Sequence, residues 1–176
     1  MNATKTHPTT QNVRKSARKP TKPLDAFDRA ILRIIQKDNK TPQRTIASEV
    51  NLSAAAVQRR IAAMEDAGII TANVALIDPW AVQLSITAVV EVQLRDERAS
   101  TVDAAKALFR SAKDVQQCYY MTGGVSCVLV IVTEDMRSYD ALARRLFSES
   151  ELVERFRTLI ALDRVKTDTS VLVPPL

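Results

Sequence analysis

The sequence predicts an α+β protein in which three helices are followed by a four-stranded sheet that carries two further helices. Apolar residues first recur with the helical period, between positions 24 and 68. Strand-like and helical segments then alternate in the order βαββαβ between 86 and 162. The 176-residue chain is 46% apolar and 26% charged, so its composition is that of a folded protein with a substantial core.

The first two expected helices are recognised by their capping residues and by apolar residues that recur along one face. Asp25 can cap the first helix, whose apolar stripe is Phe27, Ala30, Ile31, Ile34 and Ile35. Thr41 is the expected N-cap of the second helix, with Pro42 at the first helical position. This second helix is short and ends at Asn51, a residue type that tolerates the left-handed backbone of a tight turn.

A third helix is expected directly after that turn, with Ser53 as its N-cap and Gly68 at its end. Its buried stripe is Val57, Ile61 and Met64. Two helices joined by so short a turn, after a longer first helix, have the layout of a helix-turn-helix. The opposite face is small and basic in its N-terminal half. There Gln58 can pair with adenine, and Arg59 or Arg60 can reach guanine or phosphate, although an ordinary solvated face would look similar.

The second half of the chain alternates between strand and helix. Residues 71–84 resemble a wing plus linker, and the expected elements after them are strands at 86–94, 115–121, 126–133 and 153–162 and helices at 100–110 and 136–147. This order is typical of the ferredoxin-like class, with both helices on one face of the sheet. Gly123-Gly124 is a favoured two-residue hairpin turn, which would make Cys118 and Cys127 diagonal neighbours. A last strand-like piece, 169–173, could reach a second subunit.

Charge and composition exclude several classes of function. The formal net charge is +5, and the excess lies in residues 1–23, a Pro- and Thr-rich tail that we expect to be disordered and that could add affinity for phosphate. The single histidine, His7, lies in that tail, which argues against His-based catalysis and multi-His metal sites. We expect no metal site and no cofactor. The sequence has no membrane-length apolar run and no secretory signal, so we expect a cytoplasmic protein. Binding to DNA would associate it with the nucleoid.

Several stretches together resemble the Lrp/AsnC, or feast/famine, family of transcriptional regulators. They are LDAFDRAILRIIQKD, IASEVNLSAAAVQRRIAAMEDAGIIT, ALIDP and CYYMTGG, in the family's order and spacing over roughly residues 24–174. The resemblance implies a winged helix-turn-helix joined to a ferredoxin-like effector and oligomerisation domain. It also implies binding to double-stranded DNA, a homodimer that assembles into tetramers or octamers, and an amino acid-like effector. The expected boundaries are tail 1–23, helix-turn-helix 24–70, wing and linker 71–84, and effector domain 85–176.

The resemblance also carries candidate site residues onto this chain. The DNA-binding candidates are Arg44, Ser53, Ala54, Ala55, Ala56, Gln58, Arg59 and Arg60. The effector-binding candidates are Thr122, Gly123, Gly124, Ser126 and Thr158, the last contributed across an interface. Ser126 stands where the family usually has an acid that holds the ligand's amino group, and a neutral hydroxyl binds an ammonium less strongly.

Two other functions are compatible with parts of this pattern. A nucleoid-type architectural protein would use the second domain only to oligomerise and would bind DNA with little sequence preference. Haem-biosynthetic decarboxylases resemble the same two-domain architecture, but that resemblance implies a His and an Arg in the effector-domain pocket, and residues 24–176 contain no His. We therefore expect a ligand-responsive, sequence-specific regulator and not an enzyme.

Overall fold

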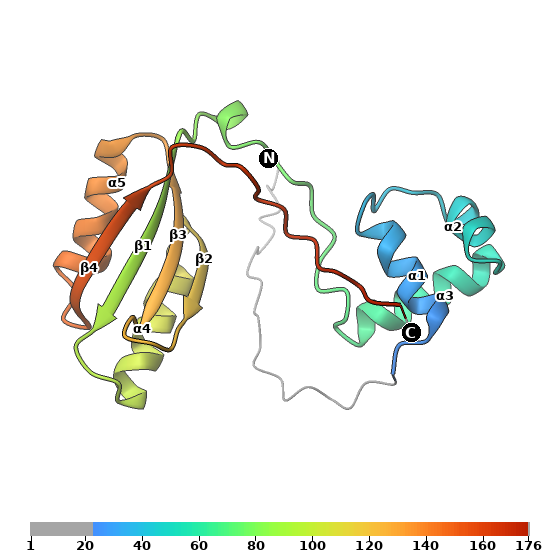
Figure 1. The fold of residues 1–176 in the computed structure, drawn as a ribbon, viewed down its shortest axis with the longest axis horizontal. Coiled ribbons are helices and arrows are strands. Elements are labelled where there is room, and N and C mark those ends of the chain that lie inside the picture. Colours follow the sequence, from blue (N-terminus) through green and yellow to red (C-terminus); the bar gives the residue numbers. More distant parts are fainter. Residues whose placement is uncertain (1–22, 176) are drawn as a thin grey trace, which may run out of the picture. The chain divides into compact units, whose positions relative to one another are not determined.

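The computed structural model describes residues 23–175 as two units, which Figure 1 shows as ribbons. The helical unit comprises residues 23–74 and 168–175, and the sheet unit comprises 75–167. The tail predicted to be disordered, 1–23, lies outside the described residues except for Pro23. None of the helices between 23 and 175 is long and apolar enough to cross a membrane.

The helical unit contains α1 (Ala26–Ile35), α2 (Gln43–Glu49) and α3 (Ala54–Asp66). Asp25 caps α1 as predicted, and it does so within a capping box: its carboxylate accepts from the Asp28 N–H, and the Asp28 carboxylate accepts from the Asp25 N–H. The predicted cap of α2 is wrong by one residue. Pro42 occupies the N-cap position, and the Thr41 hydroxyl instead donates to the carbonyl of Asp38.

The turn between α2 and α3 has the predicted chemistry. Asn51 adopts φ 55°, and the Ser53 hydroxyl accepts a hydrogen bond from the Ala56 N–H. Gly68, at φ 69°, ends the third helix. The three helices enclose a small core of their own, made of Ile31, Ile46, Ala47, Val50, Val57 and Met64. Residues 71–78, predicted as part of a wing and linker, contain no strand, and a 3₁₀ turn follows at Trp80–Val82.

The last described residues, 168–175, belong to the helical unit, and we call them the C-terminal strap. Arg29 and Arg33 of α1 and its C-cap residue Gln36 bind the strap backbone at intervals of about one turn. Arg29 donates to the Pro174 carbonyl at 3.2 Å, Arg33 to that of Val173 at 3.3 Å, and Gln36 to that of Val171 at 2.7 Å. The Gln36 carbonyl also accepts from the Val171 N–H at 2.9 Å. The strap is not the extra strand that the sequence indicates; it runs along α1 of its own chain.

The sheet unit has the predicted βαββαβ order. Its elements are β1 (Ile86–Leu94), α4 (Ala99–Ser111), β2 (Val115–Tyr120), β3 (Cys127–Thr133), α5 (Met136–Ala143, continued by a π-helical turn to Ser148) and β4 (Val153–Ile160). The strands form one antiparallel sheet in the order β2-β3-β1-β4. The ferredoxin-like class is therefore confirmed.

The two faces of this sheet differ. Alternate residues of β1, Ala88 to Leu94, are buried with residues of α4 and α5, so both helices cover the same face. Phe109 and Phe147 lie at the centre of that core. The other face, which we call the open face, carries no helix of the sheet unit. Its residues include Val89, Glu91, Gln93, Tyr119, Val128, Val130, Arg155, Arg157 and Leu159.

Candidate DNA-reading and effector sites

The N-terminal half of α3 presents a small and partly basic surface. Ser53, Ala55, Gln58 and Arg59 are exposed, while Ala54 and Ala56 are half-buried. Arg44, in the first turn of α2, is exposed as well. Since Val57 and Met64 are buried against the rest of the unit, the Gln58 and Arg59 side chains project away from the core. Gln58 and Arg59 therefore remain the candidates for contacts with base edges or phosphates.

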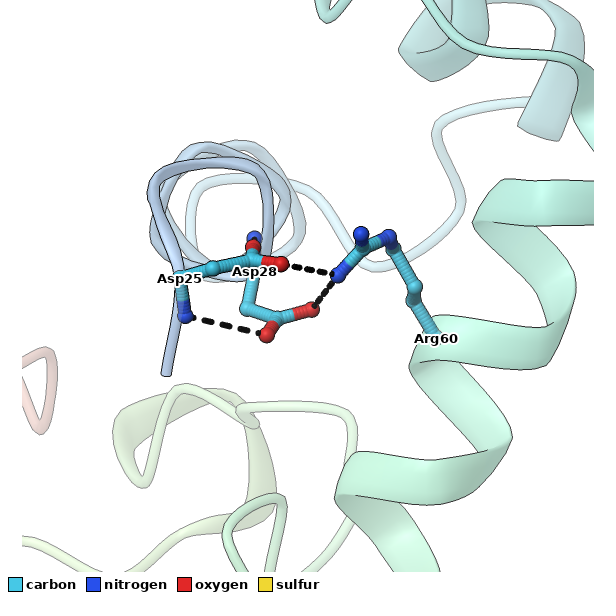
Figure 2. Close-up of polar contacts among 3 residues, drawn as sticks. All are labelled: Asp25, Asp28 and Arg60. Atoms are coloured by element: carbon cyan, nitrogen blue, oxygen red, sulfur yellow. Dashed lines mark hydrogen bonds and ion pairs between the residues drawn. The ribbon is translucent and has the colours of Figure 1, made fainter. Parts of the chain in front are cut away.

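Arg60 has a different environment. Its Nη1 donates to Asp28 at 2.7 Å and to Asp25 at 2.8 Å, and its guanidinium lies 5.4 Å from the centre of the Phe27 ring. Figure 2 shows this nitrogen between the two carboxylates. The bonds raise the pKa of Arg60; the pKa of Asp25 is lowered, chiefly by the Asp28 N–H and then by Arg60. Arg60 thus ties α3 to the capping box of α1, a contact that the sequence reasoning missed.

The β2–β3 hairpin, residues 121–125, has the predicted turn. Tyr120 opposes Cys127, and Gly123 and Gly124 adopt φ 98° and 97°, a region that residues with a Cβ rarely occupy. Thr122, Gly123 and Gly124 are exposed, and none of their N–H groups donates a hydrogen bond within residues 23–175. Their unused N–H groups are compatible with binding an anionic group, and the effector role of these residues stays a prediction.

Ser126 lies at the base of the hairpin and is only 2% exposed. Its hydroxyl accepts from the Leu94 N–H and donates to a carboxylate oxygen of Glu97 at 2.8 Å. The other Glu97 oxygen accepts from the Tyr120 hydroxyl at 2.6 Å. These two hydroxyl donors lower the pKa of Glu97. A carboxylate from the β1–α4 connection is therefore beside Ser126 after all, and the sequence reasoning did not find it.

This arrangement predicts a pH-dependent effect of replacing Glu97 with glutamine. Because the folded protein lowers the pKa of Glu97, the stabilisation by its charge is complete above about pH 4.5, the ordinary value for glutamate, and is lost as pH falls below it. Glu97→Gln is expected to lower the midpoint of thermal unfolding modestly at pH 7, and the difference between the two proteins should shrink as pH falls below about 4.5. Unfolding followed by circular dichroism across this range, with Glu154→Gln as control, checks it. A constant difference at all pH values would contradict it.

Thr158, the remaining effector candidate, is half-buried on the helix-covered face, where its hydroxyl is hydrogen-bonded to that of Tyr139. It does not line the cavity that the hairpin borders. That cavity, of about 300 Å³, lies on the open face. Its lining comes from β1, the hairpin and β4 and consists of Glu91, Gln93, Gly124, Val125, Arg155, Phe156 and Arg157. Only Gly124 of the predicted effector residues belongs to it.

The two cysteines are diagonal neighbours, as predicted, since Cys118 opposes Leu129 and Cys127 opposes Tyr120. Cys127 is buried, but Cys118 is exposed, and neither forms a disulfide. A hydrogen bond from the Cys127 thiol lowers the pKa of Cys118. No group of three or more His, Cys, Asp or Glu residues between 23 and 175 could hold a metal ion.

Comparison with known proteins agrees with both parts of this fold. Residues 24–71 match the family model of a winged helix-turn-helix DNA-binding domain, and 87–171 match the Lrp/AsnC ligand-binding domain. An HTH-type transcriptional regulator of Sinorhizobium fredii is 36% identical over 84% of this chain and 88% of its own length.

Solved structures are similar over nearly the same span. An AsnC family transcriptional regulator from Agrobacterium tumefaciens has a TM-score of 0.79 and 30% identity, covering 85% of this chain and 97% of that one. A Neisseria meningitidis transcriptional regulator, solved as a complex with L-methionine, has a TM-score of 0.77 and 26% identity, covering 85% of this chain and 97% of that one.

The fold and these matches define a DNA-binding transcriptional regulator with a separate ligand-binding domain. The relatives and structural neighbours are regulators and not enzymes. The chain belongs to the Lrp/AsnC family.

Proposed function

We propose that this regulator recognises a palindromic or repeated operator through the N-terminal half of α3. The observation that carries the proposal is the exposure of Gln58 and Arg59 on a helix whose opposite side is buried. Arg44, Ser53 and the alanines 54–56 border them and allow close approach to the major groove. Arg60 acts through α1, because both carboxylates that it binds belong to the capping box.

The proposed ligand is an amino acid or a close relative that binds beside the β2–β3 hairpin. The free N–H groups of the hairpin support this, as does the L-methionine complex of the Neisseria neighbour. The open face supports a homodimer, because Leu159 and Tyr119 leave 44% and 54% of their surfaces exposed there. We propose further association into tetramers or octamers, and action in the cytoplasm, on the nucleoid.

The experiment that tests this function is fluorescence anisotropy with DNA from upstream of the protein's own gene and with a scrambled fragment, at near-physiological salt. A preference of about 10³-fold or more is expected for a specific regulator. Equal affinity for both fragments, with a steep dependence on salt, would instead favour an architectural protein. Binding to neither fragment would contradict both.

A further inference from the structure

A pair of cysteines on β2 and β3 takes no part in either proposed site. Cys118 and Cys127 are the two cysteines of the sequence, and both are free thiols. They lie on the same face of the sheet, because Cys118 opposes Leu129, which is buried with Cys127 in the core beneath α4 and α5. The pair is therefore not on the open face, to which we assign the dimer contact.

Cys118 is the accessible member of the pair. Its side chain is exposed, and a hydrogen bond from the Cys127 thiol lowers the pKa of Cys118. The positive charges of Arg110 and Lys106 on α4 lower this pKa further. The ammonium group of Lys106 lies 4.1 Å from the centre of the Tyr120 ring, at the same end of β2. An exposed thiol in positive surroundings is the environment in which cysteines react with oxidants, because the thiolate is the nucleophile.

Cys127 is the protected member of the pair. It has no exposed surface, and its hydrogen bond to Cys118, together with burial, raises the pKa of Cys127. A buried, protonated thiol does not react with an oxidant in solution, but it can attack a neighbouring sulfur that has already been oxidised. Redox-sensor cysteines are commonly accessible thiolates of low pKa that lie beside such a second thiol.

We propose that Cys118 and Cys127 form a reversible disulfide when the protein meets a peroxide. The Cys118 thiolate attacks one peroxide oxygen, the O–O bond breaks, and the other oxygen takes up a proton and leaves as water or an alcohol. Cys118 is thereby oxidised to a sulfenic acid, and the peroxide is reduced. The Cys127 sulfur then displaces the hydroxyl group from Cys118. The S–S bond forms, the S–O bond breaks, and the hydroxyl leaves as water with the proton of the Cys127 thiol.

The two strands must move slightly closer for this bond to form. Diagonal neighbours in an antiparallel pair have Cα atoms about 7–8 Å apart, just beyond the separation that a disulfide spans. The thiols are already hydrogen-bonded to each other, so their side chains have the required direction. β2 is an edge strand that pairs with β3 alone, and its register is irregular between Val115 and Gln117. It can therefore shift without breaking strand pairs on its other side.

The test exposes the full-length protein to one equivalent of hydrogen peroxide at neutral pH and follows its intact mass and free thiols. The expected product is a single chain that has lost about 2 Da and both titratable thiols, because one disulfide replaces two S–H groups. Peptide mapping is expected to find Cys118 joined to Cys127. Dithiothreitol should restore the mass and both thiols, which distinguishes this product from methionine sulfoxide.

The same substitution at each cysteine assigns the two roles and serves as a matched control. Cys127→Ser is expected to stop at the sulfenic acid of Cys118, which dimedone traps. Cys127→Ala repeats this measurement in case a buried serine hydroxyl destabilises the core. Cys118→Ser is expected to react with peroxide about 10-fold or more slowly than wild type, because its remaining thiol is buried and protonated.

Three results would overturn the proposal: two thiols that survive in the treated wild type, a disulfide that joins two chains in place of Cys118 and Cys127, or a Cys118→Ser variant that is oxidised as fast as wild type. The proposal goes beyond the proposed function and does not depend on it. Neither DNA nor an effector is present in the peroxide experiment, so its failure and a failure of the anisotropy experiment are distinguishable.

Discussion

Arg60→Ala is expected to lower both the stability of the helical unit and its affinity for DNA, whereas Arg59→Ala lowers affinity alone. Arg60 forms ion pairs with two carboxylates, but its side chain is 30% exposed, so solvent screening weakens both pairs. We therefore expect Arg60→Ala to lower the free energy of unfolding by about 1 kcal/mol. Arg59 has no such partner among the described residues, and losing a base contact costs about 1–3 kcal/mol of binding. Thermal unfolding and anisotropy on each variant measure the two quantities.

Asp28→Asn separates a positioning role for Arg60 from direct contact with DNA. Removing an acid near DNA ordinarily strengthens binding, because phosphate is no longer repelled. If Arg60 instead acts by holding α3 against α1, Asp28→Asn lowers the unfolding temperature and does not strengthen binding to the specific DNA fragment. Acid tests the same link: Arg60 is one of the groups that lower the pKa of Asp25, after the Asp28 N–H, so the contribution of the Asp25 charge is lost as pH falls below about 3.8 and the stability difference between wild type and Arg60→Ala should become smaller there. Equal stability of Arg60→Ala and wild type at pH 7 would refute the positioning role.

Phe109→Ala is expected to cause the largest loss of stability, about 3–5 kcal/mol, in the sheet unit. Its ring has no exposed surface, and its centre lies 6.0 Å from that of Phe147. Because the helical unit has a separate core, we expect calorimetry to show one transition moved to lower temperature and another retained. Met136→Ala, which removes a side chain from a residue that is 49% exposed, is the control and should cost roughly 0.5 kcal/mol. A single transition that moves as a whole would mean that the units unfold together.

The elements themselves could be predicted because their signals are local. Helical and strand periods, the Asp25 and Ser53 caps and the Gly123-Gly124 turn each depend on residues a few positions apart. The one wrong cap, at Thr41, came from the same local reasoning, since Thr and Pro are both common at helix starts and only the backbone decides which residue is first.

The site contacts that were missed join residues far apart in sequence. Arg60 meets Asp25 across 35 positions, and Ser126 meets Glu97 across 29. An acid three residues after an acidic N-cap was a visible sign of a capping box, but nothing local indicated which cation would join it. The Gln93–Arg155 pairing depends on β4 lying beside β1, which is a property of the assembled sheet. The exposed face of α3 could be predicted from the period of one helix, whereas the surroundings of the hairpin depend on how the whole sheet assembles.

The C-terminal strap makes the helical unit discontinuous along the chain. Residues 23–74 and 168–175 fold together, so the sheet unit is inserted between two pieces of its neighbour and is joined to it by two covalent connections. A chimaeric regulator that joins residues 23–74 to a foreign sensor through one junction would leave Arg29, Arg33 and Gln36 without their backbone partners. Exchange of sensors between such regulators therefore requires two splice points, with the strap retained after the second.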